Sequence, residues 1–287
     1  MHLTDNIAEV LFVQNKTYKL AALDMDGTLL CSDHSVSDYT LNVLARVDAC
    51  GKIAALATGR CLSELREFID TIPALRYIIC ENGANIYNTR AKKSIHRVSI
   101  PQADVEFAIA ELEKRTVIAQ MFMEDQSYIR APKEIDLRPY HIDDFRPVFE
   151  AGSVFDPNLF DRYRATHPPV DKIDLYFLSE TDRDEFHTII SQRNLEIAGS
   201  IGIGLEVSPL NANKSDGLIK LCELLNLPIE EAIAIGDADN DKGILQVAGL
   251  AVAMGNALPE IKTIADYITE DCDSHGAAKA LERFILN

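Results

Sequence analysis

Two carboxylates separated by one residue end the first apolar segment of the chain. Asp24 and Asp26 follow residues 19–23, and Gly27 and Thr28 come next. A buried strand that ends in acids and a glycine turn is a common way to place reactive carboxylates at the edge of a sheet. If the extended backbone persists, both carboxylates project to the same side. A solvated strand end with a turn has the same pattern, so the interpretation depends on the rest of the chain.

Further polar residues follow other apolar segments or begin a helix. They are Thr58 and Gly59 after residues 52–57, Lys214 at a helix start, and Asp237, Asn240 and Asp241 after residues 232–235. In an open parallel sheet, ligands bind beyond the carboxyl ends of the strands. Together with Asp24 and Asp26, these groups make four such features. Four are hard to explain as scattered surface polarity, so the sequence predicts one shared site.

The residue types at this predicted site favour a cation and a phosphate. Three carboxylates at hydrogen-bonding range repel each other unless a cation lies among them. Oxygen ligands without His or Cys favour a hard ion, and Mg²⁺ is the natural choice because it shares substrate phosphate oxygens. Lys214 and Thr58 supply donors for phosphate oxygens, together with backbone amides at helix starts.

Composition and charge limit the classes of partner. The formal net charge of the 287 residues is -17, which argues against a nucleic acid or an anionic membrane as partner. No run of about 18 apolar residues occurs, so no membrane span is expected. The N-terminus lacks the pattern of a secretory signal, and the first dozen residues are expected to form a short helix or an ordered tail. The six cysteines contain no C-x-x-C pair, which favours reduced thiols in a cytoplasmic protein. The sequence says little about the oligomeric state, and a monomer or small homo-oligomer is expected.

The apolar segments that must position these residues follow two different patterns along the chain. Strands alternate with helices up to residue 84 and after residue 207, which predicts βαβ units and a parallel sheet buried on both faces. The short segments between are mixed in order, which indicates an inserted α+β domain. The predicted fold class is α/β, with a Rossmann-like core formed by residues 1–84 and 208–287 and an inserted domain at 85–207.

The expected elements follow the same division. Core strands are expected at 19–23, 52–57, 77–80, 232–235, 250–254 and 267–268, and core helices at 38–49, 62–69, 215–225, 241–247, 259–264 and 277–285. In the inserted domain, strands are expected at 86–87, 95–98, 119–124, 128–130, 172–179, 195–197 and 203–207, and helices at 105–114 and 182–192. Residues 132–169 are expected to hold a helix or two with long loops.

Several short motifs occur in a fixed order along the chain. They are Asp24-Met25-Asp26-Gly27-Thr28, Ala57-Thr58-Gly59-Arg60, Asn82-Gly83-Ala84, Lys214, Gly236-Asp237-Ala238-Asp239-Asn240-Asp241 and Ala253-Met254-Gly255-Asn256-Ala257. In this order they resemble the haloacid dehalogenase (HAD) superfamily of phosphohydrolases, and within it the Cof-type branch. The resemblance covers both ends of the chain and leaves the middle as a cap domain.

The resemblance implies a catalytic and a metal-binding set. Asp24 would attack phosphorus and form an aspartyl phosphate, and Asp26 would protonate the leaving oxygen and then activate water. Asp24 and Asp237 would bind Mg²⁺ with the backbone carbonyl of Asp26, and Asp241 would lie in the inner or outer shell of the metal.

The resemblance also implies a phosphate-binding set. Thr58, Gly59 and Lys214 would hold the phosphoryl group, and Asn240 would orient the phosphate or the metal-bound water. The cap would close on the substrate, exclude water before attack and select the leaving group.

The leading hypothesis is an Mg²⁺-dependent phosphatase acting on a small phosphate monoester, such as a sugar phosphate or a phosphorylated cofactor. A phosphotransferase or phosphomutase with the same nucleophile is the first alternative. A non-catalytic ligand-binding protein on this fold is the weakest, because every catalytic position is filled. The pattern does not choose among Arg130, Lys172, Asp174 and Tyr176 as substrate contacts, and His275 is a further candidate for contact with the site.

Overall fold

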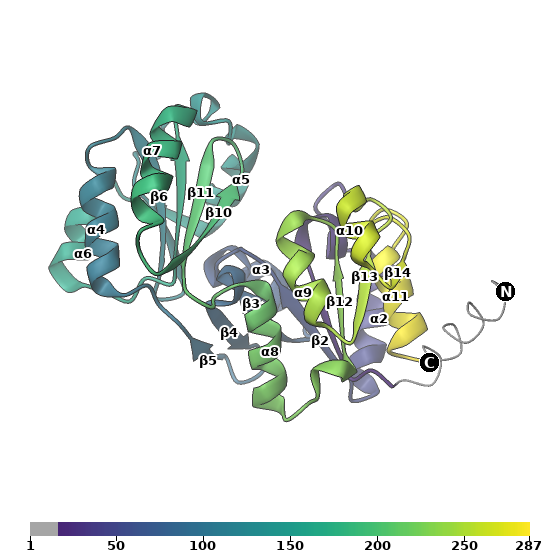
Figure 1. The fold of residues 1–287 in the computed structure, drawn as a ribbon. Coiled ribbons are helices and arrows are strands. Elements are labelled where there is room, and N and C mark those ends of the chain that lie inside the picture. Colours follow the sequence, from purple (N-terminus) through teal and green to yellow (C-terminus); the bar gives the residue numbers. More distant parts are fainter. Residues whose placement is uncertain (1–16) are drawn as a thin grey trace, which may run out of the picture. The chain divides into compact units, whose positions relative to one another are not determined.

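The computed structural model describes residues 17–287, which form two compact units (Figure 1). The first unit comprises the chain up to Ala57, Pro73–Tyr77 and Leu218–Asn287, and the second comprises Thr58–Ile72 and Ile78–Gly217. The short helix or tail expected for the first dozen residues lies outside the described residues. The domain limits at residues 84 and 207 stay a prediction.

The first unit is built on parallel strands in the order β14-β13-β12-β1-β2. Their bounds are β1 Leu20–Leu23, β2 Ile53–Ala57, β12 Ala232–Gly236, β13 Leu250–Ala253 and β14 Tyr267–Ile268. Every residue of β1, β12 and β13 is buried, as continuous apolar runs predict for a parallel sheet covered on both faces. The same sheet continues through β3 Leu75–Cys80 to the hairpin β4 Asn85–Asn88 and β5 Lys93–Arg97.

The helices that lie wholly in the first unit cover its strands. They are α2 Asp38–Ala49, α9 Lys242–Val247, α10 Pro259–Ile264 and α11 Gly276–Phe284. Helix α2 begins as predicted at Ser37, whose side chain accepts the backbone N–H of Thr40 at 3.2 Å. Helix α11 packs against α2, whereas α9 and α10 pack near β12 and β13.

The strand order reverses between β1 and β12. The connection from β1 through α2 leads to β2 on one side, and the connection from β12 through α9 leads to β13 on the other. Because such crossovers are right-handed, α2 and α9 cover opposite faces of the sheet, as Figure 1 shows. The adjacent carboxyl ends of β1 and β12 therefore form the topological switch point at which ligands bind in open α/β sheets.

The second unit contains a separate six-stranded sheet in the order β10-β11-β9-β6-β7-β8. Its strands are β6 Val117–Met123, β7 Gln126–Ile129, β8 Ser153–Phe155, β9 Lys172–Phe177, β10 Leu195–Ser200 and β11 Gly204–Pro209. The helices of this unit are α3 Arg66–Thr71, α4 Gln102–Leu112, α5 Arg146–Gly152, α6 Leu159–Thr166 and α7 Glu180–Ile190. One further helix, α8 Lys214–Leu225, leads from the second unit back into the first.

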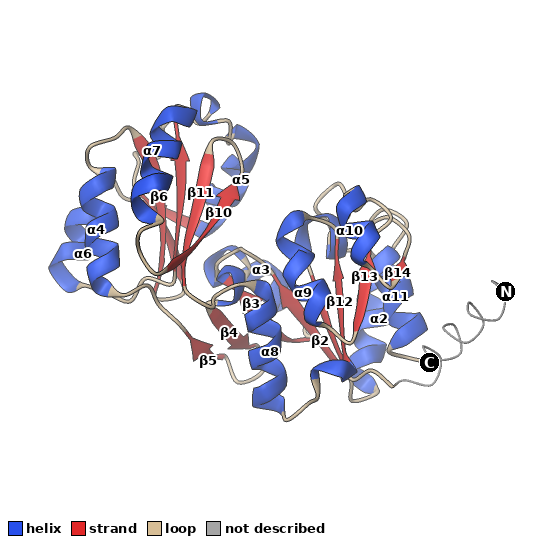
Figure 2. Cartoon of the chain, in the orientation of Figure 1, coloured by secondary structure: helices blue, strands red, loops and turns tan. Residues whose placement is uncertain are grey.

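The two faces of this second sheet bury different sets of side chains. Ala119 and Met121 of β6 pack with α4, α6 and α7, which lie beside the strands in Figure 2. Ile118 points to the opposite face, where it packs with Phe149 of α5. This alternation with a period of two confirms the strand predicted here.

Most differences from the expected elements are shifts of their ends. The three-residue strand β8 was not predicted, and α5 and α6 account for the helices expected within residues 132–169. The predicted α/β class with an additional α+β sheet is confirmed. Within residues 17–287, no helix is both long and apolar enough to cross a membrane.

Candidate active site

The backbone turns sharply where β1 ends. Leu29 N–H donates to the carbonyl of Asp24 at 3.2 Å, and Leu30 N–H donates to that of Met25 at 2.9 Å, which closes a wide turn over Met25–Leu29. The strand therefore ends at Leu23, although the backbone is extended at Asp24 (φ -64°, ψ 165°) and again at Asp26 (φ -80°, ψ 119°). Asp24 is buried, with 8% of its surface exposed, whereas Asp26 is exposed.

This turn requires glycine at position 27. Gly27 has a φ of 79°, in the left-handed region that other residues rarely adopt. A Cβ atom built there would lie 2.5 Å from Oδ2 of Asp237. The missing side chain therefore lets the turn after β1 approach the carboxylate that follows β12.

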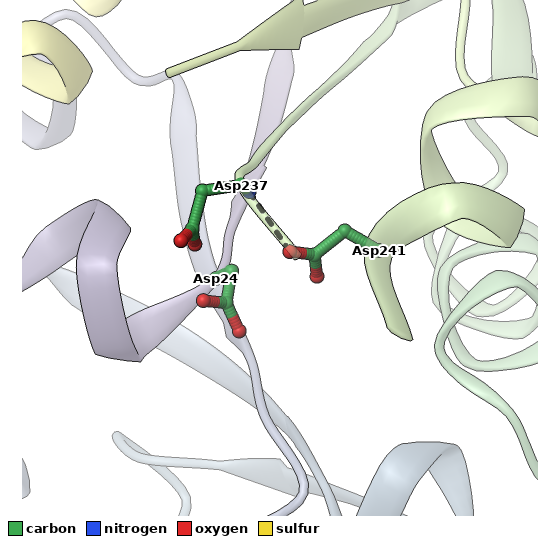
Figure 3. A group of neighbouring side chains, drawn as sticks. All are labelled: Asp24, Asp237 and Asp241. Atoms are coloured by element: carbon green, nitrogen blue, oxygen red, sulfur yellow. Dashed lines mark hydrogen bonds between the residues drawn. The ribbon is translucent and has the colours of Figure 1, made fainter. Parts of the chain in front are cut away.

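Three carboxylates converge at the switch point (Figure 3). Asp24 follows β1, Asp237 follows β12, and Asp241 lies in the turn that leads into α9. Each of these residues offers one oxygen atom within 4.8 Å of the others. Oδ2 of Asp241 accepts the backbone N–H of Asp237 at 3.0 Å and that of Ala238 at 3.1 Å, and these bonds hold its carboxylate beside the strand end.

The side chains of Thr28 and Asn256 orient Asp237. Both residues belong to motifs named in the sequence analysis, which assigned neither of them a role at the site. Thr28 donates its hydroxyl to Oδ1 of Asp237 at 3.0 Å. Nδ2 of Asn256 lies 2.8 Å from the carbonyl of Gly27 and 3.4 Å from Oδ2 of Asp237. The N–H of Cys272 donates to Oδ1 of Asn256 at 3.0 Å, which fixes the direction of the amide.

This donor set fits a hard divalent cation. The group consists of carboxylates alone, and both Asp24 and Asp241 are buried. Like charges held this close and shielded from water are unfavourable unless a cation or protons neutralise them. Carboxylate oxygens are the ligands that Mg²⁺ prefers, so Asp24, Asp237 and Asp241 could hold that ion.

The predicted phosphate loop begins directly after β2. Thr58 N–H donates to the carbonyl of Ile79 at 2.8 Å, and Asn82 N–H donates to the carbonyl of Thr58 at 3.1 Å. Glu81 N–H donates to the carbonyl of Arg60 at 3.0 Å. These bonds hold residues 58–60 against the turn that follows β3.

That turn places a fully buried carboxyl group beneath the loop. Glu81, Asn82 and Gly83 have φ values of 54°, 56° and 106°, so three successive residues adopt the left-handed region. The Glu81 side chain is 0% exposed. Its burial, together with the neighbouring Asp171, raises the pKa of Glu81 to about 8, so this carboxyl keeps its proton at neutral pH.

Lys214 is the first residue of α8 and is buried, with 2% of its surface exposed. The preceding Asn213 starts the helix, because its Oδ1 accepts the backbone N–H of Asp216 at 3.0 Å. Thr58, Gly59 and Lys214 belong to the second unit, whereas the three carboxylates belong to the first. Their convergence on one phosphoryl group stays a prediction.

The remaining candidates have different surroundings. Asn240 is exposed in the turn before α9. Nδ1 of His275 lies 3.1 Å from Oγ of Ser37, and its ring centroid lies 5.2 Å from that of Tyr39, so His275 packs against the start of α2. Lys172, a candidate substrate contact, is 1% exposed.

The other two candidates on β9 are also enclosed. Asp174 is 6% exposed and Tyr176 is 3% exposed. Tyr176 donates its hydroxyl to Oε1 of Gln120 at 3.0 Å. With Lys172, they therefore form a polar row inside the second unit, and whether any of them contacts a substrate stays a prediction.

Comparison with known proteins agrees with this fold. A family model described as haloacid dehalogenase-like hydrolase matches residues 21–281. The chain therefore belongs to this family, and the predictions of the superfamily and of a hydrolase are confirmed.

Its relatives include phosphatases of similar length. Phosphatase YwpJ of Bacillus subtilis is 28% identical over 93% of this chain and 100% of its own length. The 5-amino-6-(5-phospho-D-ribitylamino)uracil phosphatase YcsE of the same species is 29% identical, over 93% of this chain and 96% of its own. The crystal structure of a haloacid dehalogenase-like hydrolase from Bacteroides thetaiotaomicron superposes with a TM-score of 0.81 at 25% identity, over 93% of this chain and 99% of that one.

Proposed function

We propose that the protein is an Mg²⁺-dependent phosphatase that hydrolyses a small phosphate monoester through an aspartyl phosphate on Asp24. The observation that carries the proposal is the group of three carboxylates at the switch point, formed by Asp24, Asp237 and Asp241. The small phosphorylated substrate of its relative YcsE supports a metabolite as substrate, with a sugar phosphate or a phosphorylated cofactor as the expected class.

Each residue has a proposed task. Asp24 attacks phosphorus, and the exposed Asp26 donates a proton to the leaving oxygen before it takes one from the attacking water. Thr58, Gly59 and Lys214 hold the phosphoryl oxygens by hydrogen bonds and charge.

The metal would share its ligands with this machinery. Asp24, Asp237 and Asp241 would hold Mg²⁺ together with the backbone carbonyl of Asp26, and the bound ion would neutralise charge between the nucleophile and the phosphate. Asn240 orients the phosphate, and closure of the cap, predicted at 85–207, excludes water. A cytoplasmic location and a monomer or small homo-oligomer remain predictions.

Phosphate release from p-nitrophenyl phosphate with Mg²⁺ tests the proposal. Asp24→Asn is expected to lower kcat on the order of 10³-fold or more, because it removes the nucleophile. Asp239→Asn is the matched control, since this exposed neighbour has no proposed task and its variant should retain activity. Activity that survives in Asp24→Asn would refute the proposed nucleophile. A bisphosphate requirement without net phosphate release would favour the phosphomutase.

A further inference from the structure

A buried lysine lies directly beneath the predicted phosphate loop. Nζ of Lys172 lies 3.1 Å from Oδ1 of Asp174, 3.1 Å from Oε2 of Glu206 and 3.2 Å from the carbonyl oxygen of Gly59. The ammonium group therefore donates a hydrogen bond to the Gly59 carbonyl and forms ion pairs with the two carboxylates. Burial opposes the charge, but the two carboxylates raise the pKa of Lys172, so the ammonium form is retained.

The bond to Gly59 continues to a hydroxyl group. The Gly59 carbonyl and the Arg60 N–H belong to the same peptide plane, and that N–H donates to Oγ1 of Thr58 at 3.2 Å. Because Oγ1 of Thr58 accepts this bond with a lone pair, the single proton of its hydroxyl is available for another acceptor. Because bonds in such a chain polarise one another, a cation at the carbonyl strengthens the N–H donor at the other end.

We infer that Lys172 is a positioning residue that acts through the Gly59–Arg60 peptide to aim the hydroxyl proton of Thr58 at a phosphoryl oxygen. This inference rests on the proposed phosphatase function and on the proposed phosphate contact of Thr58. Lys172 itself is assigned no contact with the substrate, because its ammonium group is held between the Gly59 carbonyl and the carboxylates of Asp174 and Glu206.

A second set of bonds holds the same loop from the other side. Nδ2 of Asn82 donates to Oε2 of Glu206, and the backbone N–H of Asn82 donates to the carbonyl of Thr58 at 3.1 Å. A Cβ atom on Gly59 would lie 3.0 Å from Oδ1 of Asn82 and 3.5 Å from Nζ of Lys172. Lys172, Glu206 and Asn82 thus enclose the Gly59 peptide and leave it little room to rotate.

Inhibition by inorganic phosphate is the readout that a merely structural role would not change. Lys172→Met is expected to raise the inhibition constant of phosphate by about tenfold, the effect of one misdirected charge-assisted hydrogen bond. It should also raise KM proportionally more than it lowers kcat. This variant leaves the buried Asp174 and the partly buried Glu206 without their cation. The triple variant Lys172→Met/Asp174→Asn/Glu206→Gln therefore removes the three charges together.

The matched control is Arg115→Met. Arg115 is another largely buried cation of the second unit, 9% exposed and 3.3 Å from Glu111. This variant should lower the thermal unfolding temperature and leave the phosphate inhibition constant at the wild-type value.

A double-mutant cycle with Thr58→Val separates the possible outcomes. If Lys172 acts through Thr58, Lys172→Met should have less than a threefold further effect on the inhibition constant in the Thr58→Val background. Equal effects in both backgrounds, or an unchanged constant in a folded Lys172 variant of an active enzyme, would overturn the inference alone. A wild-type enzyme without phosphatase activity would overturn the proposed function and this inference together.

Discussion

Thr28 and Asp237 are 209 residues apart in the sequence, and the Thr28 hydroxyl donates to Oδ1 of Asp237 at 3.0 Å. Thr28 belongs to the turn after β1, and Asp237 directly follows β12. Because β1 and β12 are paired in parallel, this bond links the two strand ends that carry the carboxylates. It leaves Asp237 oriented before any ion binds.

Removal of this hydroxyl should weaken metal binding. Thr28→Val keeps the shape of a buried side chain but removes one of the donors to Asp237, and loss of such an outer partner typically costs 10- to 100-fold in metal affinity. Calorimetric titration with Mg²⁺ measures the effect independently of turnover. Thr28→Ser, which restores the hydroxyl, should bind Mg²⁺ nearly as the wild type does. Equal affinities for the wild type and the valine variant would argue against this role.

The position of the Asn256 amide predicts which of two substitutions lowers the activity more. Asn256→Ala removes a donor to Gly27 and Asp237, whereas Asn256→Asp places a carboxylate 2.8 Å from one oxygen and 3.4 Å from another. Repulsion should make the aspartate variant less active than the alanine variant, although aspartate is closer in size. The measurement is kcat/KM at saturating Mg²⁺. An alanine variant as impaired as the aspartate variant would contradict the electrostatic explanation.

The buried Glu81 predicts how stability depends on pH. Its pKa is raised from 4.5 to about 8 in the folded protein, so its contribution is fully present below pH 4.5 and is lost as the pH rises through about 8. Over this window the free energy of unfolding should fall by up to about 1.4 kcal/mol per pH unit from this group. Urea unfolding at a series of pH values should show a smaller fall for Glu81→Gln.

The control for this pH effect is an exposed glutamate on the same unit. Glu67→Gln on α3 should keep the wild-type dependence on pH, because Glu67 is exposed. Between pH 5 and 8, the free energy of unfolding of the wild type should fall more steeply than that of Glu81→Gln, by up to about 1.4 kcal/mol per pH unit. Equal falls in the two proteins would show that the Glu81 carboxyl is not protonated in the folded protein.

Much of the core could be predicted because its signals are local. The apolar run before Asp24 and the alternation of strands with helices predicted β1, β2 and β12 nearly to the residue, and helix α10 at Pro259–Ile264 was predicted with its exact limits. Gly27 could be recognised as a turn residue from its place after two acids, but the approach of Asp237 could not, since it depends on the strand order.

The buried polar groups could not be predicted in the same way. Lys172 begins a strand, where a lysine is usually exposed, and its partners come from three separate segments at Gly59, Asp174 and Glu206. The spacing of Lys172 and Asp174 places them on one face of a strand, which is the one local signal of their pairing. Burial of that face is a property of the assembled sheet.

Trapping of the covalent intermediate tests the central claim most directly. Acid quench during turnover of p-nitrophenyl phosphate, followed by borohydride, reduces an aspartyl phosphate to homoserine, which mass spectrometry locates in the sequence. We expect homoserine at position 24 in the wild type, with Mg²⁺ and substrate present, and none in Asp24→Asn. Homoserine at Asp26 or Asp237, or none at any position in an enzyme that releases phosphate, would contradict it.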